Sequence, residues 1–589
     1  MGIKPRRWVI DPKAEATAHE TERVAHLSKT LGLNPITIQI LFQKGIESEE
    51  EINRYLFPKL KDLQNPFAIQ DMTRAVERMD LAKNQNEKVF IFGDYDVDGT
   101  CGAALLVWTL SEFGYEVKAD QPDRFKDGYG LNLKAVEKAH EWGAKVLISV
   151  DCGITNHEAA EKAKSLGIDL IVIDHHQVDP KRGIPQDALA VIDPQREDCL
   201  SGLKQVCGCG LAFYFAMALR AHGREKGWWH ETLPNLKQHL DLVVLATAAD
   251  MVPLTGDNRI LVAHGMQVLQ NTSKPGFRSM LEQAGLCGKT VSPGHLGFVL
   301  GPRINASGRI ENASFALRLL TTENAIEGAQ LASELERLNE ERKNLQNQIW
   351  DEVKAHVEKE IEAGKFQNAI VVGSEGWHEG VVGIVASRVT EYFRMPAIVL
   401  SIKDSKAKGS ARSYGGKNIL QALRACSELL ASFGGHHFAA GMSLDRSQLS
   451  DFQHAFDQAV SELRNPNQDD DPPLILNGAV ELDDFSFETL MEIERLGPFG
   501  VGNPEPIFQV DAEIRQHRIL KGRHLKLSLS SSESQSKFME AIWFHAAEDE
   551  ALLEELEKNP KSRWAGVPEL NRFRGRVTPT LRIRDRHSF

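Results

Sequence analysis

The sequence predicts a multidomain α/β protein organised around a parallel sheet, and three observations lead to that prediction. Between about residues 85 and 260, short β-branched runs alternate with helical segments, which is the pattern of a parallel sheet with helices on both faces. A charged, proline-free stretch with apolar residues at helical spacing follows, and alternating polarity marks the C-terminal segment. A chain of 589 residues has room for roughly three or four domains.

Composition limits the class of protein. Hydrophobic residues make up 42% and charged residues 26% of the chain, as in a soluble globular protein. We expect neither a signal peptide nor a membrane helix, because no apolar run has the required length. Seven cysteines without a CxxC pair indicate a reducing cytoplasm, with Cys207 and Cys209 as buried thiols. A net charge of −13 requires that any nucleic-acid binding rest on locally concentrated Lys and Arg.

The first elements follow in order. Residues 1 to about 55 are expected to form amphipathic helices. Cys101–Phe113 and Asn156–Leu166 are long enough for the helices that connect parallel strands. In such sheets, ligands bind at the C-terminal ends of the strands. The expected strands are Val89–Phe92, Val146–Val150, Leu170–Ile173 and Ala190–Ile192.

The stretch Lys88–Gly102, KVFIFGDYDVDGTCG, places Asp94, Asp96 and Asp98 on alternate positions after the first strand. Alternate side chains of an extended segment point the same way, so these carboxylates would repel one another unless a cation holds them. Mg²⁺ and Mn²⁺ are divalent cations that oxygen ligands bind well. An acidic surface turn is the alternative. A calcium loop fits poorly, because its twelfth position is Leu105 and not Glu.

More acids and imidazoles follow the other candidate strands. Asp is common where strands turn into loops, so each one alone carries little information. In a parallel sheet, however, the strand ends lie along one edge, and four such clusters would converge. The apolar run Leu242–Ala246, which precedes Asp250, is interpreted as another strand of this kind. The residues in question are Asp151, Asp174, His175, His176 and Asp250.

The segments GDYDVDG, VDCG, IDHH and ATAAD, in that order, resemble the DHH phosphoesterase superfamily, which includes RecJ exonucleases, nanoRNases and manganese-dependent pyrophosphatases. Five further motifs are similar to those of RecJ, and one of them, ASFGGHHFAAG, resembles the GGHxxAAG motif of the DHHA1 domain. The resemblance covers about residues 60 to 589. The five motifs are RFKDGYGLN (124–132), GPRINASGRIENA (301–313), WHEGVVGIVASRV (377–389), GSARSYGG (409–416) and ASFGGHHFAAG (431–441).

The resemblance implies a single-stranded-DNA-specific exonuclease that degrades DNA 5′→3′ to 5′-mononucleotides by two-metal-ion hydrolysis. It implies a role in DNA recombination and in recombinational, mismatch and base-excision repair. Two divalent cations, Mn²⁺ or Mg²⁺, are the expected cofactors, held by Asp94, Asp96, Asp98, Asp151, His175 and Asp250.

The resemblance also implies individual roles. Asp98, Asp151 and His176 would be catalytic, with Asp151 bridging the two ions and His176 donating a hydrogen bond to the scissile phosphate. Asp94 would ligate directly or lie behind the ligands, and Asp174 would orient its neighbours. The histidine that manganese pyrophosphatases place before their paired Asp ligands has no counterpart here.

The RecJ-like motifs further imply residues that bind DNA and its phosphates. Guanidinium groups grip phosphate through two hydrogen bonds, and glycines allow close backbone approach. Outside these motifs, an Arg would more often form a surface ion pair. The candidates are Arg124, Arg303, Asn305, Arg309, His378, Ser410, Arg412, Gly435 and His436.

After the DHH region, residues 312–363 are expected to form one long amphipathic helix that bridges two domains. A second α/β unit runs to about residue 463, and an acidic, proline-bearing linker covers residues 465–473. Alternating polarity after residue 474 predicts a small β-barrel of the OB type. Its basic tail carries Trp564, Phe573 and Phe589, which could stack on bases, or it could be a solvated basic edge.

The predicted organisation has five parts. They are an N-terminal helical extension (1–60), a DHH catalytic domain (61–314), a connecting long helix (315–364), a smaller α/β DHHA1 domain (365–464) and an OB-fold-like nucleic-acid-binding domain (474–589).

Two other functions stay open at this point. A DHH phosphodiesterase for very short RNA or cyclic dinucleotides would usually lack the long helix and the third domain. A non-catalytic repair scaffold would have lost metal-site acids that are present here. Family analogy implies single-stranded DNA, a single-strand binding protein and a RecQ-type helicase as partners. It also implies a monomer without membrane contact, in the cytoplasm and at the nucleoid.

Overall fold

The computed structural model describes residues 6–14, 18–124, 126–311, 313–463, 473–531, 538–573 and 575–588. The chain divides into two units. One holds residues 64–250 and 265–471, and the other holds residues 1–63, 251–264 and 472–589. This division into two units does not test the boundaries of the five predicted parts, which stay predictions.

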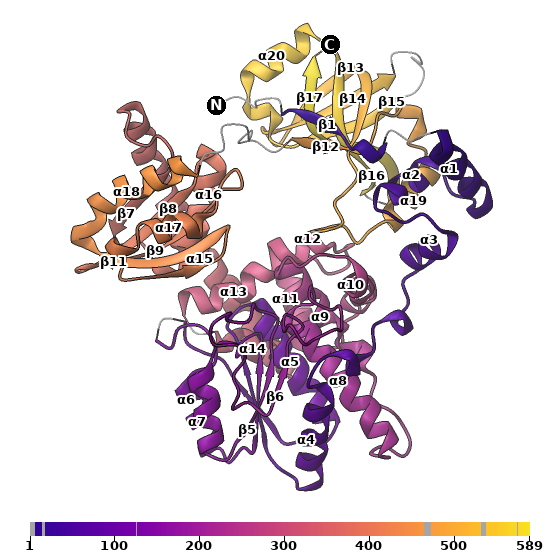
Figure 1. Cartoon of the computed structure of the whole chain (residues 1–589). Helices are drawn as coiled ribbons and strands as arrows, with labels where there is room; N and C mark the ends of the chain where they lie inside the picture. Colours follow the sequence, from indigo (N-terminus) through magenta and orange to yellow (C-terminus); the bar gives the residue numbers. More distant parts are fainter. Residues whose placement is uncertain are drawn as a thin grey trace. The chain divides into compact units, whose positions relative to one another are not determined.

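The first unit contains a five-stranded parallel sheet in the order β3-β2-β4-β5-β6. Helices α6 and α7 cover one face, and α4, α5 and α8 cover the other (Figure 1). The strands are β2 (Val89–Gly93), β3 (Val117–Asp120), β4 (Val146–Val150), β5 (Asp169–Ile173) and β6 (Ala190–Ile192). The helices are α4 (Met72–Asn84), α5 (Val97–Glu112), α6 (Leu133–Glu141), α7 (His157–Ser165), α8 (Gly208–Glu225) and α9 (Leu240–Ala249).

The predicted sheet is confirmed, with two differences. Every residue of β2 and β4 is buried, as expected for strands covered on both faces. Strand β3, a short edge strand that includes the exposed Lys118, was not predicted. The expectation that Leu242–Ala246 forms a strand-like end is wrong, because this run lies inside helix α9. A short apolar run alone does not distinguish a strand from a buried helix.

A helical segment links this sheet to the next domain. The predicted single helix over residues 312–363 is in fact two helices, since Asn324 begins the second by accepting hydrogen bonds from the N–H groups of Ile326 and Glu327. The second, α15, is 38 residues long. The helices are α10 (Gly256–Leu269), α11 (Pro275–Gln283), α12 (Pro293–His295), a π-helical turn (Leu296–Leu300), α13 (Gly301–Ile310), α14 (Ser314–Thr321) and α15 (Ala325–Glu362).

The smaller α/β domain of this unit has a mixed sheet in the order β10-β11-β9-β8-β7. Only β7 and β8 pair in parallel among its described strands. Helix α16 and the C-terminal half of α15 pack on one face, and α17 and α18 pack on the other. The elements are β7 (Ile370–Glu375), α16 (Glu379–Phe393), β8 (Ala397–Lys403), β9 (Lys406–Arg412), α17 (Ile419–Ala425), β10 (Ser432–Gly435), β11 (Ala439–Asp445) and α18 (Leu449–Glu462).

The other unit contains a closed barrel in the order β13-β14-β15-β17-β16, which confirms the predicted OB-like domain. The N-terminal helices and α19 share its apolar core. Strand β1, which pairs in parallel with β12, was not predicted. The elements are β1 (Trp8–Ile10), α1 (Ala18–Leu31), α2 (Pro35–Gln43), α3 (Glu49–Leu56), β12 (Leu474–Leu476), α19 (Phe487–Arg495), β13 (Phe508–Leu520), β14 (His524–Ser531), β15 (Phe538–Trp543), α20 (Glu550–Lys558), β16 (Lys561–Phe573) and β17 (Arg576–Ser588).

The predicted role of Trp564 as a base-stacking platform is wrong. Its side chain is fully buried in the barrel, where its indole N–H donates to the carbonyl of Ala512 at 3.1 Å. The side chain of Phe573, residue Phe589 and most of the acidic linker (464–472) lie outside the described residues. Several tail arginines pair with acids, including Arg572 with Glu494, so the basic charge of the tail is partly neutralised.

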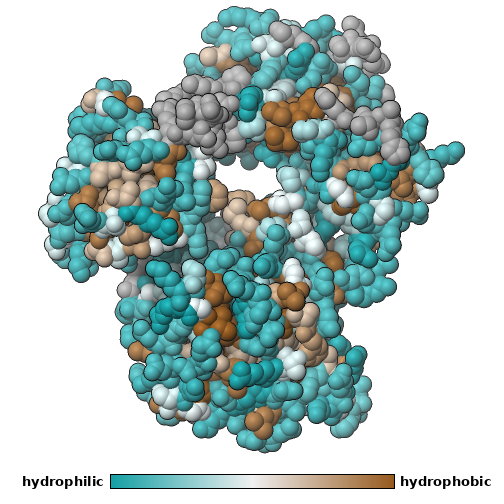
Figure 2. Space-filling view, viewed as in Figure 1, coloured by the Kyte–Doolittle hydropathy of each residue, from teal (hydrophilic) through white to brown (hydrophobic). Residues whose placement is uncertain are grey.

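In Figure 2, hydrophilic residues dominate the visible face of the part that carries β2–β6. Among the described helices, none is both long and apolar enough to cross a membrane.

Replacing Trp564 by Ala should lower the free energy of barrel unfolding by about 3–5 kcal/mol, because it empties a fully buried site. Phe544→Ala is the matched control, since the Phe544 side chain is 49% exposed, and it should cost less than about 1 kcal/mol. Urea unfolding of the intact chain, followed by tryptophan fluorescence, measures both. Equal effects would show that Trp564 is not a core residue.

Candidate metal centre and adjoining cleft

The three acids of the GDYDVDG segment lie in the turn between β2 and α5. Asp96 caps α5, and its carboxylate accepts the N–H groups of Asp98 at 2.9 Å and Gly99 at 3.1 Å. Asp98 therefore lies in the first turn of helix α5. The prediction that it lies in an extended segment is wrong. A Cβ on Gly99 would lie 2.4 Å from the backbone N of Asp94, so the turn requires glycine there.

The N-terminus of α8 holds Asp98 in place. The two carboxylate oxygens of Asp98 accept hydrogen bonds from the backbone N–H groups of Gly208 at 2.6 Å and Cys209 at 2.8 Å. The positive end of a helix dipole stabilises a carboxylate in this position. A Cβ on Gly208 would lie 2.8 Å from the Cβ of Asp151. This contact was not predicted, although the glycines that flank Cys209 before an apolar helix are a signal of close approach.

His175 lies among three carboxylates. Its Nε2 is 3.1 Å from Asp151, 3.7 Å from Asp98 and 3.8 Å from Asp250. Asp151 follows β4 with a φ of 61°, and Asp250 follows helix α9. Four elements, β4, β5, α5 and α9, therefore bring these side chains together.

Asp174 holds the two histidines. It is fully buried and accepts the backbone N–H groups of His175 at 2.8 Å and His176 at 3.2 Å. It also lies 2.7 Å from Nδ1 of His176. Burial lowers the pKa of His176, but the hydrogen bond and charge of Asp174 outweigh burial and raise that pKa to about 9. Asp174 thus engages Nδ1 of His176 and not its Nε2.

The acids around His175 repel one another. Burial first, and then the charge of Asp96, raise the pKa values of Asp94, Asp98 and Asp151. Burial and the charge of Asp98 raise the pKa of Asp250 to about 8. Such a cluster is unfavourable unless positive charge compensates it.

The donor set fits divalent cations. Three groups have ligand atoms within 4.8 Å of one another: Asp94, Asp96 and Asp151; Asp98, His175 and Asp250; and Asp151, His175 and His176. One oxygen each of Asp94, Asp151 and Asp250 is buried without a hydrogen-bond partner. Buried polar atoms are normally satisfied, and carboxylate oxygens with imidazole are ligands that suit Mg²⁺ and Mn²⁺. The structure therefore brings all six predicted metal-binding residues together.

Three nearby residues were missed. The hydroxyl of Tyr129 donates to the carbonyl of Asp151 at 3.1 Å and lies 3.2 Å from Nε2 of His176. Gln121 donates to the carbonyl of Asp94 at 2.7 Å. Asp193 follows β6 and is fully buried, and burial raises its pKa to about 8. Its place after a strand was a usable sequence signal.

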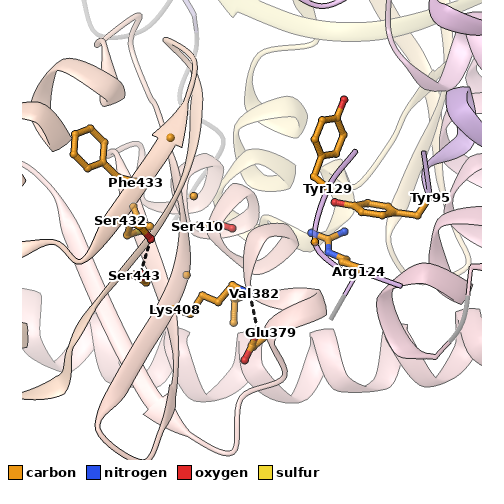
Figure 3. Close-up of a pocket in the computed structure, with 15 residues that line it drawn as sticks. Tyr95, Arg124, Tyr129, Glu379, Val382, Lys408, Ser410, Ser432, Phe433 and Ser443 are labelled. Carbon is orange, nitrogen blue, oxygen red and sulfur yellow. Dashed lines mark hydrogen bonds and ion pairs between the residues drawn. The ribbon is translucent and has the colours of Figure 1, made fainter. Parts of the chain in front are cut away.

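A cavity of about 600 Å³ adjoins this centre within the same unit. Figure 3 shows Tyr95, Arg124 and Tyr129 on one wall and Ser410, Lys408, Ser432 and Ser443 on the other. Of the predicted DNA-binding residues, Arg124 and Ser410 line it. The guanidinium of Arg124 lies 5.1 Å from the ring centre of Tyr95.

Arg309 and Arg412 lie close to Arg124. Burial lowers the pKa of Arg309 to about 10, and the charges of Arg124 and Arg412 contribute. Arg412 donates to Ser387 at 3.1 Å, and Arg309 donates to the carbonyl of Gly380 at 3.0 Å. Neighbouring guanidinium groups repel one another, and a bound anion would compensate their positive charge.

The other predicted DNA-binding residues are not among the described residues that line the cavity. Arg303 is engaged with Glu336 at 2.5 Å. His378 caps α16 by accepting the N–H of Gly380 at 3.1 Å. Gly435 is the last residue of β10, His436 begins the turn to β11, and Asn305 is half-buried on α13.

Gly208→Ala should lower Mn²⁺ affinity about 10- to 100-fold, because the new Cβ would displace Asp151 and the Asp98 oxygen 3.1 Å away. Titration calorimetry of the intact protein measures the affinity. Gly294→Ala is the control, since its Cβ would meet only the Ser292 hydroxyl at 3.6 Å. Unchanged Mn²⁺ binding in Gly208→Ala would contradict the assigned contact.

Family models match three segments of the chain. Residues 88–247 match the N-terminal domain of the DHH family, residues 365–462 match the DHHA1 domain, and residues 476–585 match the RecJ OB domain. These segments coincide with the parallel sheet, the mixed sheet and the closed barrel.

Known proteins are similar along nearly the whole chain. The single-stranded-DNA-specific exonuclease RecJ of Bacillus subtilis is 34% identical, with 96% of this chain and 70% of that protein covered. Its namesake in Escherichia coli is 35% identical, with 89% of each covered. The crystal structure of Thermus thermophilus RecJ in complex with Mn²⁺ superposes with a TM-score of 0.81 at 27% identity, covering 99% of this chain and 79% of that one. On this similarity in sequence, domain content and fold, the chain belongs to the RecJ family.

Proposed function

We propose that this protein is a single-stranded-DNA-specific exonuclease that degrades DNA 5′→3′ and releases 5′-mononucleotides. The observation that carries the proposal is the buried carboxylate and imidazole cluster beside a cavity lined by Arg124 and Ser410. The cluster fits two divalent cations, and the cavity fits a phosphate-bearing chain. The names of the relatives support the choice of single-stranded DNA.

The chain's own residues divide into two ligand groups. Asp94 and Asp96 would hold one cation and Asp98, His175 and Asp250 the other, with Asp151 between them, as their ligand atoms are grouped. When bound, two such cations lower the pKa of water and stabilise the charge that develops on a phosphoryl group.

His176 would act on the scissile phosphate. Asp174 holds its Nδ1 at 2.7 Å, which orients the ring and leaves Nε2 to donate a hydrogen bond to a phosphate oxygen. The hydroxyl of Tyr129, 3.2 Å from the same nitrogen, limits the rotation of the ring. We therefore assign Asp98, Asp151 and His176 to the reaction, and Tyr129 to positioning.

The arginines would set the polarity of the reaction. Arg124, Arg309, Arg412 and Ser410 would bind the 5′-terminal phosphate, because guanidinium and hydroxyl groups satisfy its oxygens. A strand anchored there would present its next phosphodiester to the metal centre, so mononucleotides would leave. The second strand of a duplex would have no place in the cavity.

The cellular setting is also a proposal, supported by family membership alone. We propose action in DNA recombination and in recombinational, mismatch and base-excision repair, in the cytoplasm at the nucleoid. The protein would work as a monomer, with a single-strand binding protein and a RecQ-type helicase as partners.

A digestion time course with Mn²⁺ or Mg²⁺ tests the activity on 5′-labelled and 3′-labelled single strands and on a blunt duplex. Labelled mononucleotide should appear at once from the 5′-labelled strand, a shrinking ladder should appear from the 3′-labelled strand, and the duplex should stay intact. Asp98→Asn should reduce the rate by about 100-fold or more, since it removes a metal-binding charge.

Asp187→Asn is the matched control, because the Asp187 side chain is 39% exposed and pairs only with Lys164 at 2.7 Å among the described residues. Cutting confined to oligomers of a few nucleotides would instead favour a nanoRNase. Full activity in Asp98→Asn would contradict the assigned metal centre.

A further inference from the structure

One wall of the cavity is the outer face of β9, β10 and β11. The pairing of these strands sets two rows of side chains on that face. The inner row is Ser410, Gly441 and Gly434, and the outer row is Lys408, Ser443 and Ser432. Two residues of a strand span about 6.6 Å, so the outer row begins about that far beyond Ser410, on the side away from Arg412.

Packing does not explain the glycines of the inner row. A Cβ on Gly434 would meet nothing within 4 Å, and a Cβ on Gly441 would meet only the carbonyl of Gly409 at 4.0 Å. Neighbouring Gly435 differs, since its Cβ would lie 2.4 Å from the carbonyl of Ala439. Because Gly434 and Gly441 have no side chains, the surface between the proposed phosphate-binding residues and the outer row stays open.

The outer row is polar and close to electrically neutral. Lys408 pairs with Glu379 at 3.2 Å, and the hydroxyls of Ser432 and Ser443 lie 2.6 Å apart. Figure 3 shows both contacts on the same wall as Ser410. A second phosphate would meet a carboxylate there, which is unfavourable. Hydroxyls, an amide edge or a sugar would find donors and acceptors.

We propose that the outer row binds the 5′-terminal nucleoside of a strand that ends in a 5′-hydroxyl. This inference rests on the proposed exonuclease function and extends it to a second kind of end. The first internal phosphate would then occupy the arginine site that a terminal phosphate otherwise fills. The cavity of about 600 Å³ is large for a single phosphate and suits a ligand of this size.

The register of cutting shifts by one nucleotide as a result. Water adds to the phosphorus between the second and third nucleotides, and the bond from that phosphorus to the 3′ oxygen of the second nucleotide breaks. One water proton ends on that 3′ oxygen, and the other leaves as the new 5′-phosphate ionises. The first product is a dinucleoside monophosphate, and the shortened strand carries a 5′-phosphate, so all later products are mononucleotides.

The test digests one sequence with either a 5′-hydroxyl or a 5′-phosphate, in Mn²⁺, and identifies the earliest products by mass spectrometry. The 5′-phosphorylated strand should release a mononucleotide first, and the 5′-hydroxyl strand should release a dinucleoside monophosphate first. A free nucleoside as the first product, or a resistant 5′-hydroxyl strand, would overturn the inference while the exonuclease function stands. If neither strand is cut, the exonuclease function fails, and this inference fails with it.

Ser443→Trp fills the outer row and should lower the rate on the 5′-hydroxyl strand relative to the 5′-phosphorylated strand about 10-fold or more. The ratio is independent of how much protein folds, since both strands use one metal centre. Lys406→Trp is the control, because Lys406 is exposed on the neighbouring strand β9, two residues from Lys408, and does not line the described cavity. An equal ratio in both variants would contradict the assigned site.

Discussion

Repulsion among buried carboxylates is the constraint on which the rest of this structure depends. Asp94, Asp98 and Asp151 are almost fully buried and close to one another, an arrangement that costs free energy without compensating positive charge. Several local features of the fold hold these carboxylates in place. Gly99 lets the β2–α5 turn close, and the backbone N–H groups that begin α8 fix Asp98.

The proposed anion site lies in the same unit as the proposed cation site. Helix α15 packs its C-terminal half against the mixed sheet, whose core includes Ile349 and Val353, while its N-terminal half packs on α11 and α13. This single rigid element joins the two sheets. Under the proposed function, one cleft would anchor a strand through the guanidinium groups and cut it at the cations.

Much of the fold and of the site could be predicted from sequence, because short buried strands each end in an acid or histidine. The predictions that proved wrong have physical explanations. Asp98 lies in a helix and Asp250 directly follows one, and the spacing of acids does not reveal whether a segment is extended or helical. Trp564 lies among basic residues, but tertiary packing turns it inward. The contacts of Gly208 and Tyr129 join segments that are separated in sequence, so the local pattern around each residue does not identify its partner.

Locating the cations directly tests the central claim. Crystals grown with Mn²⁺ and measured at its absorption edge give anomalous peaks where the ions lie. The account predicts two peaks, one bounded by Asp94, Asp96 and Asp151 and one by Asp98, His175 and Asp250. Absence of any peak among these side chains at saturating Mn²⁺, or strong peaks only elsewhere, would contradict the two-cation centre and the exonuclease mechanism that rests on it.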